Sequence, residues 1–175
     1  MSTIAELNLP PSVYATLVKH LLPPGATCEE AAFGFASTRS ENGRLIFALL
    51  ELLPVPPEGF VERSRYFLHL TDEMRGRVIK RAHDLSASLI EFHSHPLQPH
   101  AEFSPSDRTG FQEFVPHVKW RLKGRPYAAF VFTPTTFDAL AWVSDVAAPI
   151  AFDAIAADGH RHPSTKMTFS NWRPT

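Results

Sequence analysis

The sequence predicts an α/β protein built on a mixed, largely antiparallel and curved sheet flanked by helices. Helix-like and strand-like segments are mixed without the regular alternation that a doubly wound parallel sheet requires. The pair Asn42-Gly43 between two apolar runs is typical of an antiparallel hairpin. The chain has 175 residues, 44% of them hydrophobic, and carries no internal repeat or low-complexity linker. We therefore expect residues 1–175 to form one domain with a sizeable core.

The first half of the chain carries a helical pattern followed by strand patterns. Apolar residues at helical spacing precede the breaker Pro23-Pro24-Gly25. A capped helix start, with acids in its first turn, lies at Thr71-Asp72-Glu73. In order, we expect a helix over Pro11–Leu22, strands over Cys28–Ser37, Arg44–Leu53 and Tyr66–Leu70, and a second helix beginning at Thr71.

The second half of the chain begins with a short apolar segment, Ala87–His93, which is typical of a buried strand. Pro96 cannot donate to a sheet ladder, so this strand should end there and continue as a loop. Further along, we expect a helix beginning at Ser104, strands over Tyr127–Thr133 and Phe137–Ser144, and a last strand pair around Asp158-Gly159.

Two histidines two residues apart, His93 and His95, stand at the end of the predicted strand. Residues two apart on a strand point to the same face, so both rings can present a nitrogen to one point in space, while Ser94 faces away. This arrangement is compatible with a metal site, although a His-x-His pair on an apolar strand is by itself more often a matter of packing.

A carboxylate arrives after the loop, in Ser104-Pro105-Ser106-Asp107. Serine, proline and an acid at these offsets are typical of a capping box at a helix start. An aspartate held in this way can still turn an oxygen to a metal. Two histidines and one aspartate leave tetrahedral zinc one open position, where water with a pKa of about 7 becomes a nucleophile. His93, His95 and Asp107 are therefore the predicted zinc ligands.

A hydrolytic zinc site also needs a general base that is not itself a ligand. Glu29 and Glu30 are the candidates, since they open a run that changes from acidic to apolar and small within two residues. Adjacent residues face opposite sides of a strand, so only one of the pair can point into the site.

These residues resemble the motif of the JAMM metalloproteases, also called the JAB or MPN-plus domain. The resemblance extends from Glu29 to about Phe132. The family pattern is a glutamate on an early strand, then His-Ser/Thr-His-Pro, then Ser-x-x-Asp. The matching residues are Glu29 or Glu30, His93, Ser94, His95, Pro96, Ser104 and Asp107.

The resemblance implies a role for each matching residue. His93, His95 and Asp107 would bind zinc, the glutamate would activate water, and the Ser104 hydroxyl would help stabilise the oxyanion. Glu29 is favoured over Glu30, because the family glutamate usually stands three residues before a small residue, here Ala32. The loop from Pro96 to Phe103 is one residue longer than is usual in the family, which makes Ser106 the nearest competitor for the serine role.

The resemblance also implies a fold and a function. The fold would be that of the MPN/JAB domain, which is related to the cytidine deaminases. The activity would be that of a zinc peptidase or isopeptidase that cleaves after the C-terminus of a ubiquitin-like modifier, with activating and conjugating enzymes as pathway partners. The alternatives are a catalytically inactive MPN scaffold and a zinc hydrolase that acts on a sulfur-carrier protein or a small molecule.

Composition narrows the possible classes of partner and the expected cellular location. The formal net charge of −1 gives no electrostatic case for nucleic acid. The single cysteine, Cys28, which we expect to be a small buried residue, cannot form an internal disulfide. The first six residues lack the basic and apolar regions of a signal peptide, and no apolar run approaches the ~20 residues of a membrane span. We therefore expect a cytoplasmic protein without a membrane partner.

Overall fold

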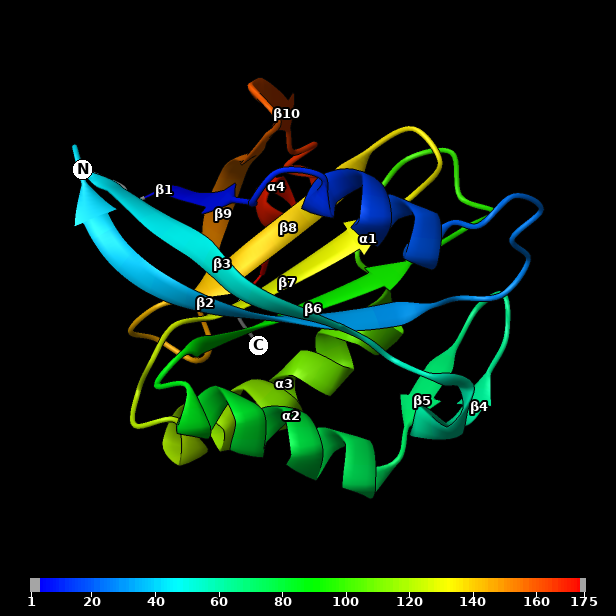
Figure 1. Cartoon of the computed structure of the whole chain (residues 1–175), viewed down its shortest axis with the longest axis horizontal. Coiled ribbons are helices and arrows are strands. Elements are labelled where there is room, and N and C mark those ends of the chain that lie inside the picture. Colours follow the sequence, from blue (N-terminus) through cyan, green and yellow to red (C-terminus); the bar gives the residue numbers. More distant parts are fainter. Residues whose placement is uncertain (1–3, 174–175) are drawn as a thin grey trace.

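Seven strands close into a mixed β-barrel in the computed structural model, which describes residues 4–173 (Figure 1). The described residues leave out 174–175 and also 1–3, which belong to the N-terminal segment considered above. Around the barrel the strands are β1 (Ile4–Asn8), β3 (Arg44–Pro54), β2 (Ala31–Glu41), β6 (Ser88–Ser94), β7 (Tyr127–Phe132), β8 (Phe137–Trp142) and β9 (Ile150–Ala157), and β9 pairs again with β1.

The expectation of an open curved sheet flanked by helices is therefore wrong, and so is the fold that the family resemblance implied. The segment that closes the barrel is β1, which the sequence patterns did not identify as a strand. It pairs in parallel with both β3 and β9, with Leu7 opposite Phe47 on one side and Ile155 on the other. Because β1 occupies both positions at once, neither β3 nor β9 remains an edge of the sheet.

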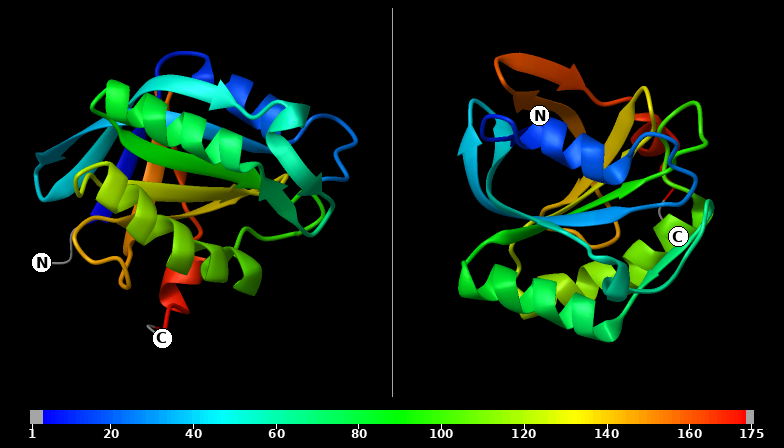
Figure 2. Two further views of the ribbon diagram at one scale, coloured as in Figure 1. Left: turned by 90° about the horizontal axis from the view of Figure 1, so that it is seen from below. Right: turned by 45° about the vertical axis from the view of Figure 1, so that its right-hand side comes forward.

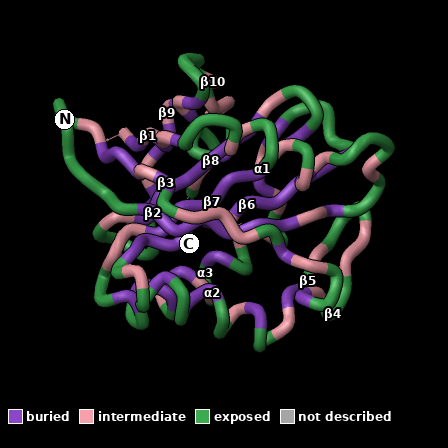
Figure 3. Tube along the Cα trace, viewed as in Figure 1, coloured by how far each residue is buried: buried purple, intermediate pink, exposed green. Residues whose placement is uncertain are grey.

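The barrel interior is filled by apolar side chains that alternate with outward-facing residues along each strand. All seven strands contribute to this cluster, and Leu17 and Leu21 of helix α1 (Val13–Leu21) pack against it. Figure 3 shows the same concentration of buried residues along the central strands. Representative buried members, one from each strand in chain order, are Leu7, Ala32, Phe47, Phe92, Phe130, Ala139 and Phe152.

A second apolar cluster lies on the outer face of the barrel, beneath helices α2 (Asp72–Asp84) and α3 (Pro105–Arg121). These helices lie together on the side of the sheet opposite α1, as Figures 1 and 2 show. The cluster combines apolar residues of both helices with outward-facing residues of β2, β6, β7 and β8. The candidate site described below lies at one border of this cluster.

The remaining elements are short. Strands β4 (Phe60–Arg63) and β5 (Leu68–Leu70) form a separate two-stranded ribbon beside the barrel, preceded by a 3₁₀ turn at Pro57–Gly59. Strand β10 (His160–Pro163) pairs antiparallel with β9, and helix α4 (Met167–Ser170) follows it. Within the described residues, none of the helices has the length and apolar character needed to cross a bilayer.

Most of the predicted helices and strands are confirmed, with bounds that shift by a few residues. Asn42 and Gly43 both have positive φ, as a tight hairpin turn between β2 and β3 requires. The Thr71 hydroxyl caps α2 by accepting a hydrogen bond from the Met74 N–H at 3.1 Å. The sequence patterns missed β1, β4 and α4, and Cys28 is exposed rather than buried.

Candidate metal centre

The two histidines reach the outer face of the barrel from strand β6 and the residue after it. Along β6, Ile90 and Phe92 point into the barrel, so Glu91 and His93 point outward, toward α3. The His95 N–H donates to the Phe132 carbonyl at 2.8 Å, which continues the pairing with β7 beyond the end of β6. Both rings are buried, and their centroids lie 5.0 Å apart.

The aspartate reaches the same point from the first turn of α3. The Asp107 N–H donates to the Ser104 hydroxyl oxygen at 3.1 Å, and Asp107 Oδ2 accepts from the Ser104 N–H at 2.7 Å. This reciprocal pair is the capping box that the sequence predicts, with Pro105 at the first helical position. The cap therefore fixes the aspartate side chain against the histidines.

His93, His95 and Asp107 form one compact group of possible metal ligands, with one ligand atom from each residue within 4.8 Å of the others. His93 Nε2 lies 3.5 Å from Asp107 Oδ1, and His95 Nε2 lies 3.3 Å from Asp107 Oδ2. Ligands about 2.0–2.1 Å from a tetrahedral zinc ion stand ~3.3–3.4 Å apart. The observed spacing fits a metal ion of that size.

One buried atom supports this fit. His93 Nε2 is shielded from solvent and has no hydrogen-bond partner among the described residues. A buried polar atom without a partner is costly unless something else satisfies it. A cation between the rings and the carboxylate would satisfy Nε2, so a buried group that could hold a metal ion is present, as the sequence predicted.

The charges in the site are strongly coupled. Burial alone would lower the pKa of His93, but Asp107 and Glu91 outweigh it and raise that pKa to about 10. Burial opposes ionisation of Asp107 as well, yet His93 and His95 hold the pKa of its carboxyl well below the usual range. A metal ion binds the neutral imidazole, so metal binding would displace the proton from His93.

Of the two candidate glutamates, Glu29 lies in the site and Glu30 does not. Glu29 is 4% exposed, and its Oε1 lies 3.6 Å from His95 Nε2. Burial raises the pKa of Glu29, and the nearby histidines oppose that shift. Glu30 forms an ion pair with Arg63. Glu29 is not a member of the compact ligand group, so it stands beside a three-ligand site rather than closing it.

Sequence reasoning missed the residues that hold the histidine rings. Glu91 Oε1 lies 3.6 Å from His93 Nδ1, and the Gln98 amide oxygen lies 3.1 Å from His95 Nδ1. These contacts leave Nε2 of each ring facing Asp107. One signal was available, because Glu91 stands two residues before His93 and must share its face of the strand.

The loop that joins the histidines to α3 is anchored by threonines from distant segments. The Ala101 N–H donates to the Thr136 hydroxyl oxygen, and the Ala101 carbonyl accepts from the Thr165 hydroxyl, both at 3.0 Å. The Phe103 N–H donates to the Thr168 hydroxyl oxygen at 2.9 Å. These contacts hold the loop so that the capping box lies against the histidines.

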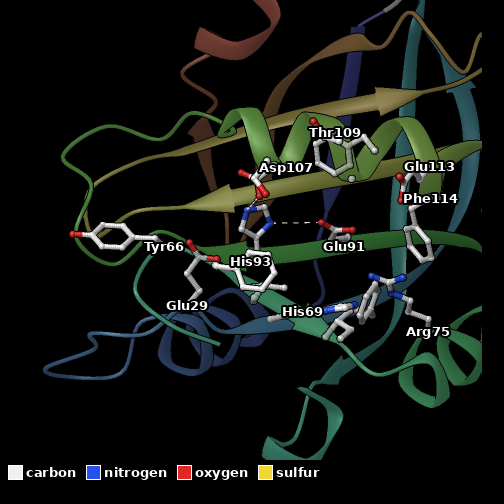
Figure 4. A pocket seen from close by; sticks show the side chains of 18 residues that line it. Glu29, Tyr66, His69, Arg75, Glu91, His93, Asp107, Thr109, Glu113 and Phe114 are labelled. Carbon is white, nitrogen blue, oxygen red and sulfur yellow. Dashed lines mark ion pairs between the residues drawn. The ribbon is translucent and has the colours of Figure 1, made fainter. Parts of the chain in front are cut away.

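A pocket of about 420 Å³ opens beside the ligand group (Figure 4). In Figure 4, His93 and Asp107 face each other near its centre, Tyr66 and Glu29 lie on one side, and Arg75 and Phe114 lie on the other. Its walls come from the first half of α3, from β5 with the residues before it, and from the outer face of the barrel. Ser106 lines the pocket and Ser104 bonds to Asp107, so both candidate serines lie near the site.

Comparisons with known proteins identify no relative. A scan of the chain against protein-family models finds no match, and a search of the curated proteins finds none either.

Proposed function

We propose that this chain is a zinc-dependent hydrolase of amide bonds. The observation that carries the proposal is the compact group of His93, His95 and Asp107, with the buried carboxylate of Glu29 beside it and a pocket leading to it. Three nitrogen and oxygen ligands that leave one position open are typical of catalytic rather than structural zinc. When bound, zinc supplies a Lewis acid that polarises a carbonyl group and activates water near neutral pH.

Each residue has a part in this proposal. Glu29 accepts the proton of the attacking water and delivers it to the leaving amine, because its carboxylate lies beside Nε2 of His95, whereas the other nearby carboxylate, Glu91, contacts Nδ1 on the far side of the His93 ring. Ser104 orients Asp107, since its hydroxyl donates to Asp107 Oδ2 at 2.8 Å. The Ser104 N–H also bonds to that oxygen, so the hydroxyl can turn toward the oxyanion while the cap persists.

The proposed substrate is the bond after the C-terminus of a ubiquitin-like modifier, in a conjugate or a precursor. This substrate class and the activating and conjugating enzymes of such a pathway come from the resemblance to the JAMM motif alone. A second candidate is a zinc hydrolase of a small amide or of a sulfur-carrier protein. The pocket volume supports the small amide as a substrate, because about 420 Å³ lies within the range of small-molecule binding sites.

The test uses two adjacent glutamates as a matched pair. Glu29→Gln and Glu30→Gln each remove one carboxylate, but only Glu29 faces the ligands. Zinc content and cleavage of a panel of ubiquitin-like fusions, sulfur-carrier fusions and small amides are measured for both variants and the wild type.

We expect Glu29→Gln to keep zinc and lose ~10²–10⁴-fold in turnover, and Glu30→Gln to remain close to the wild type. An active Glu29→Gln enzyme would remove Glu29 from the mechanism. Zinc-loaded wild type that cleaves no member of the panel would favour the inactive scaffold, and the member that is cleaved identifies the substrate class.

A further inference from the structure

Glu91, to which the proposed reaction gives no role, contacts two buried groups. One of its carboxylate oxygens, Oε1, lies 3.6 Å from His93 Nδ1, and the other, Oε2, accepts a hydrogen bond from the Tyr127 hydroxyl. Figure 4 shows the contact between Glu91 and His93 along the pocket wall. Tyr127 reaches Glu91 from the neighbouring strand β7, and its side chain is fully buried. Tyr127, Glu91 and His93 thus form a chain that ends at a candidate metal ligand.

The need of the Tyr127 hydroxyl for a hydrogen-bond acceptor does not by itself explain why residue 91 is a glutamate. A buried tyrosine hydroxyl needs an acceptor, but a glutamine oxygen would serve as well and would cost less to remove from water. Among the described residues, Glu91 makes no ion pair with lysine or arginine, and its side chain is only 21% exposed. A negative charge on Glu91 would stabilise the positively polarised ring of His93.

The two histidines differ in this respect. His93 Nδ1 faces an anion, whereas His95 Nδ1 faces the neutral amide oxygen of Gln98 at 3.1 Å. A carboxylate on the far nitrogen of a metal-binding imidazole fixes the orientation of the ring and strengthens the other nitrogen as a ligand. The amide fixes orientation but supplies less charge.

We propose that Glu91, held in place by Tyr127, is a positioning residue that makes His93 the stronger of the two histidine ligands. The inference rests on the proposed metal site and deepens it. It assigns Glu91 no contact with substrate and no part in proton transfer.

Metal affinity tests the inference without any need for a substrate. The dissociation constants of zinc and Co²⁺ are measured by competition with a chromophoric chelator, and the visible absorption of the Co²⁺ protein reports the ligand field. The variants are Glu91→Gln, which keeps an acceptor for Tyr127 but removes the charge, and Tyr127→Phe, which removes the hydroxyl. Glu113→Gln is the control, since Glu113 lines the same pocket and makes no contact with His93.

We expect Glu91→Gln to bind zinc ~10–100-fold more weakly than the wild type and to shift the Co²⁺ absorption bands. Tyr127→Phe should weaken binding less, and Glu113→Gln should stay within about twofold. Thermal denaturation of the metal-free proteins separates loss of the ligand from loss of the fold.

Three results would overturn the inference. Unchanged affinity and unchanged Co²⁺ bands in Glu91→Gln would refute it while leaving the metal site intact. Equal losses of zinc affinity in Glu91→Gln and Glu113→Gln would show a general effect of the charge in the pocket. A wild type that binds neither metal would refute the proposed function, and this inference with it.

Discussion

Replacing Leu7 with alanine tests whether strand β1 closes the barrel. Leu7 is fully buried in the interior, opposite Phe47 of β3 and Ile155 of β9. The substitution removes three buried carbon atoms, worth ~0.8 kcal/mol each, or about 2.4 kcal/mol in transfer free energy. The cavity adds to this, so the free energy of unfolding should fall by about 3–4 kcal/mol, within the ~2–5 kcal/mol range of such changes.

Chemical denaturation measures this loss, and Leu50→Ala is its control. Leu50 lies on the adjacent strand β3 but is 55% exposed, so its truncation should change stability by less than about 0.5 kcal/mol. For a domain of this size, the predicted loss for Leu7→Ala corresponds to a Tm decrease of ~6–15 °C. Zinc affinity should stay within about twofold, because β1 pairs with β3 and β9 and not with β6, the strand that leads to the candidate ligands. Equal stability of the two variants would refute the closed barrel.

Two further predictions concern the candidate metal ligand Asp107 and the barrel surface. Asp107→Asn keeps an oxygen for the Ser104 N–H but removes the negative charge. Zinc affinity, measured by chelator competition, should therefore fall more than ~100-fold, while the helical circular-dichroism signal is kept. Unchanged affinity would exclude Asp107 as a ligand. Lys166, Arg44 and Arg161 hold the pKa of Asp153 well below its usual range. Its contribution to stability is therefore present above the unfolded-state pKa of about 3.9 and is lost as the pH falls through the lower folded-state pKa. Asp153→Asn should be less stable at pH 6 by about 1 kcal/mol or less and should lose less stability than the wild type between pH 6 and pH 3, and parallel denaturation midpoints for the two proteins would contradict this.

The parts of the site that the sequence could predict depend on local geometry. A strand places His93 and His95 on one face whatever surrounds it, and a capping box sets Asp107 relative to Ser104 within a single turn. The same alternation implied that only one of Glu29 and Glu30 faces the ligands, but the choice of Glu29 came from the family resemblance. These relations span only a few residues, so their side-chain directions can be inferred without a fold.

The fold itself could not be predicted, because its defining contacts are distant in sequence. Strand β1 is only Ile4–Asn8, too short for a clear periodic signal, and it pairs with segments near residues 44–48 and 152–156. Nothing local in those residues requires a parallel partner on each side. The same holds for Tyr127 and Thr168, whose contacts near the site exist only once β7 and α4 are in place.

The metal content of the purified protein is the decisive test of the proposed zinc site. Purified wild type and His95→Ala are compared by elemental analysis, and the same samples are assayed for cleavage of a ubiquitin-like fusion. We expect about one zinc per wild-type chain, and loss of both zinc and cleavage in the variant. Metal-free, inactive wild type that resists reconstitution with zinc would contradict it, as would a His95→Ala protein that keeps its zinc.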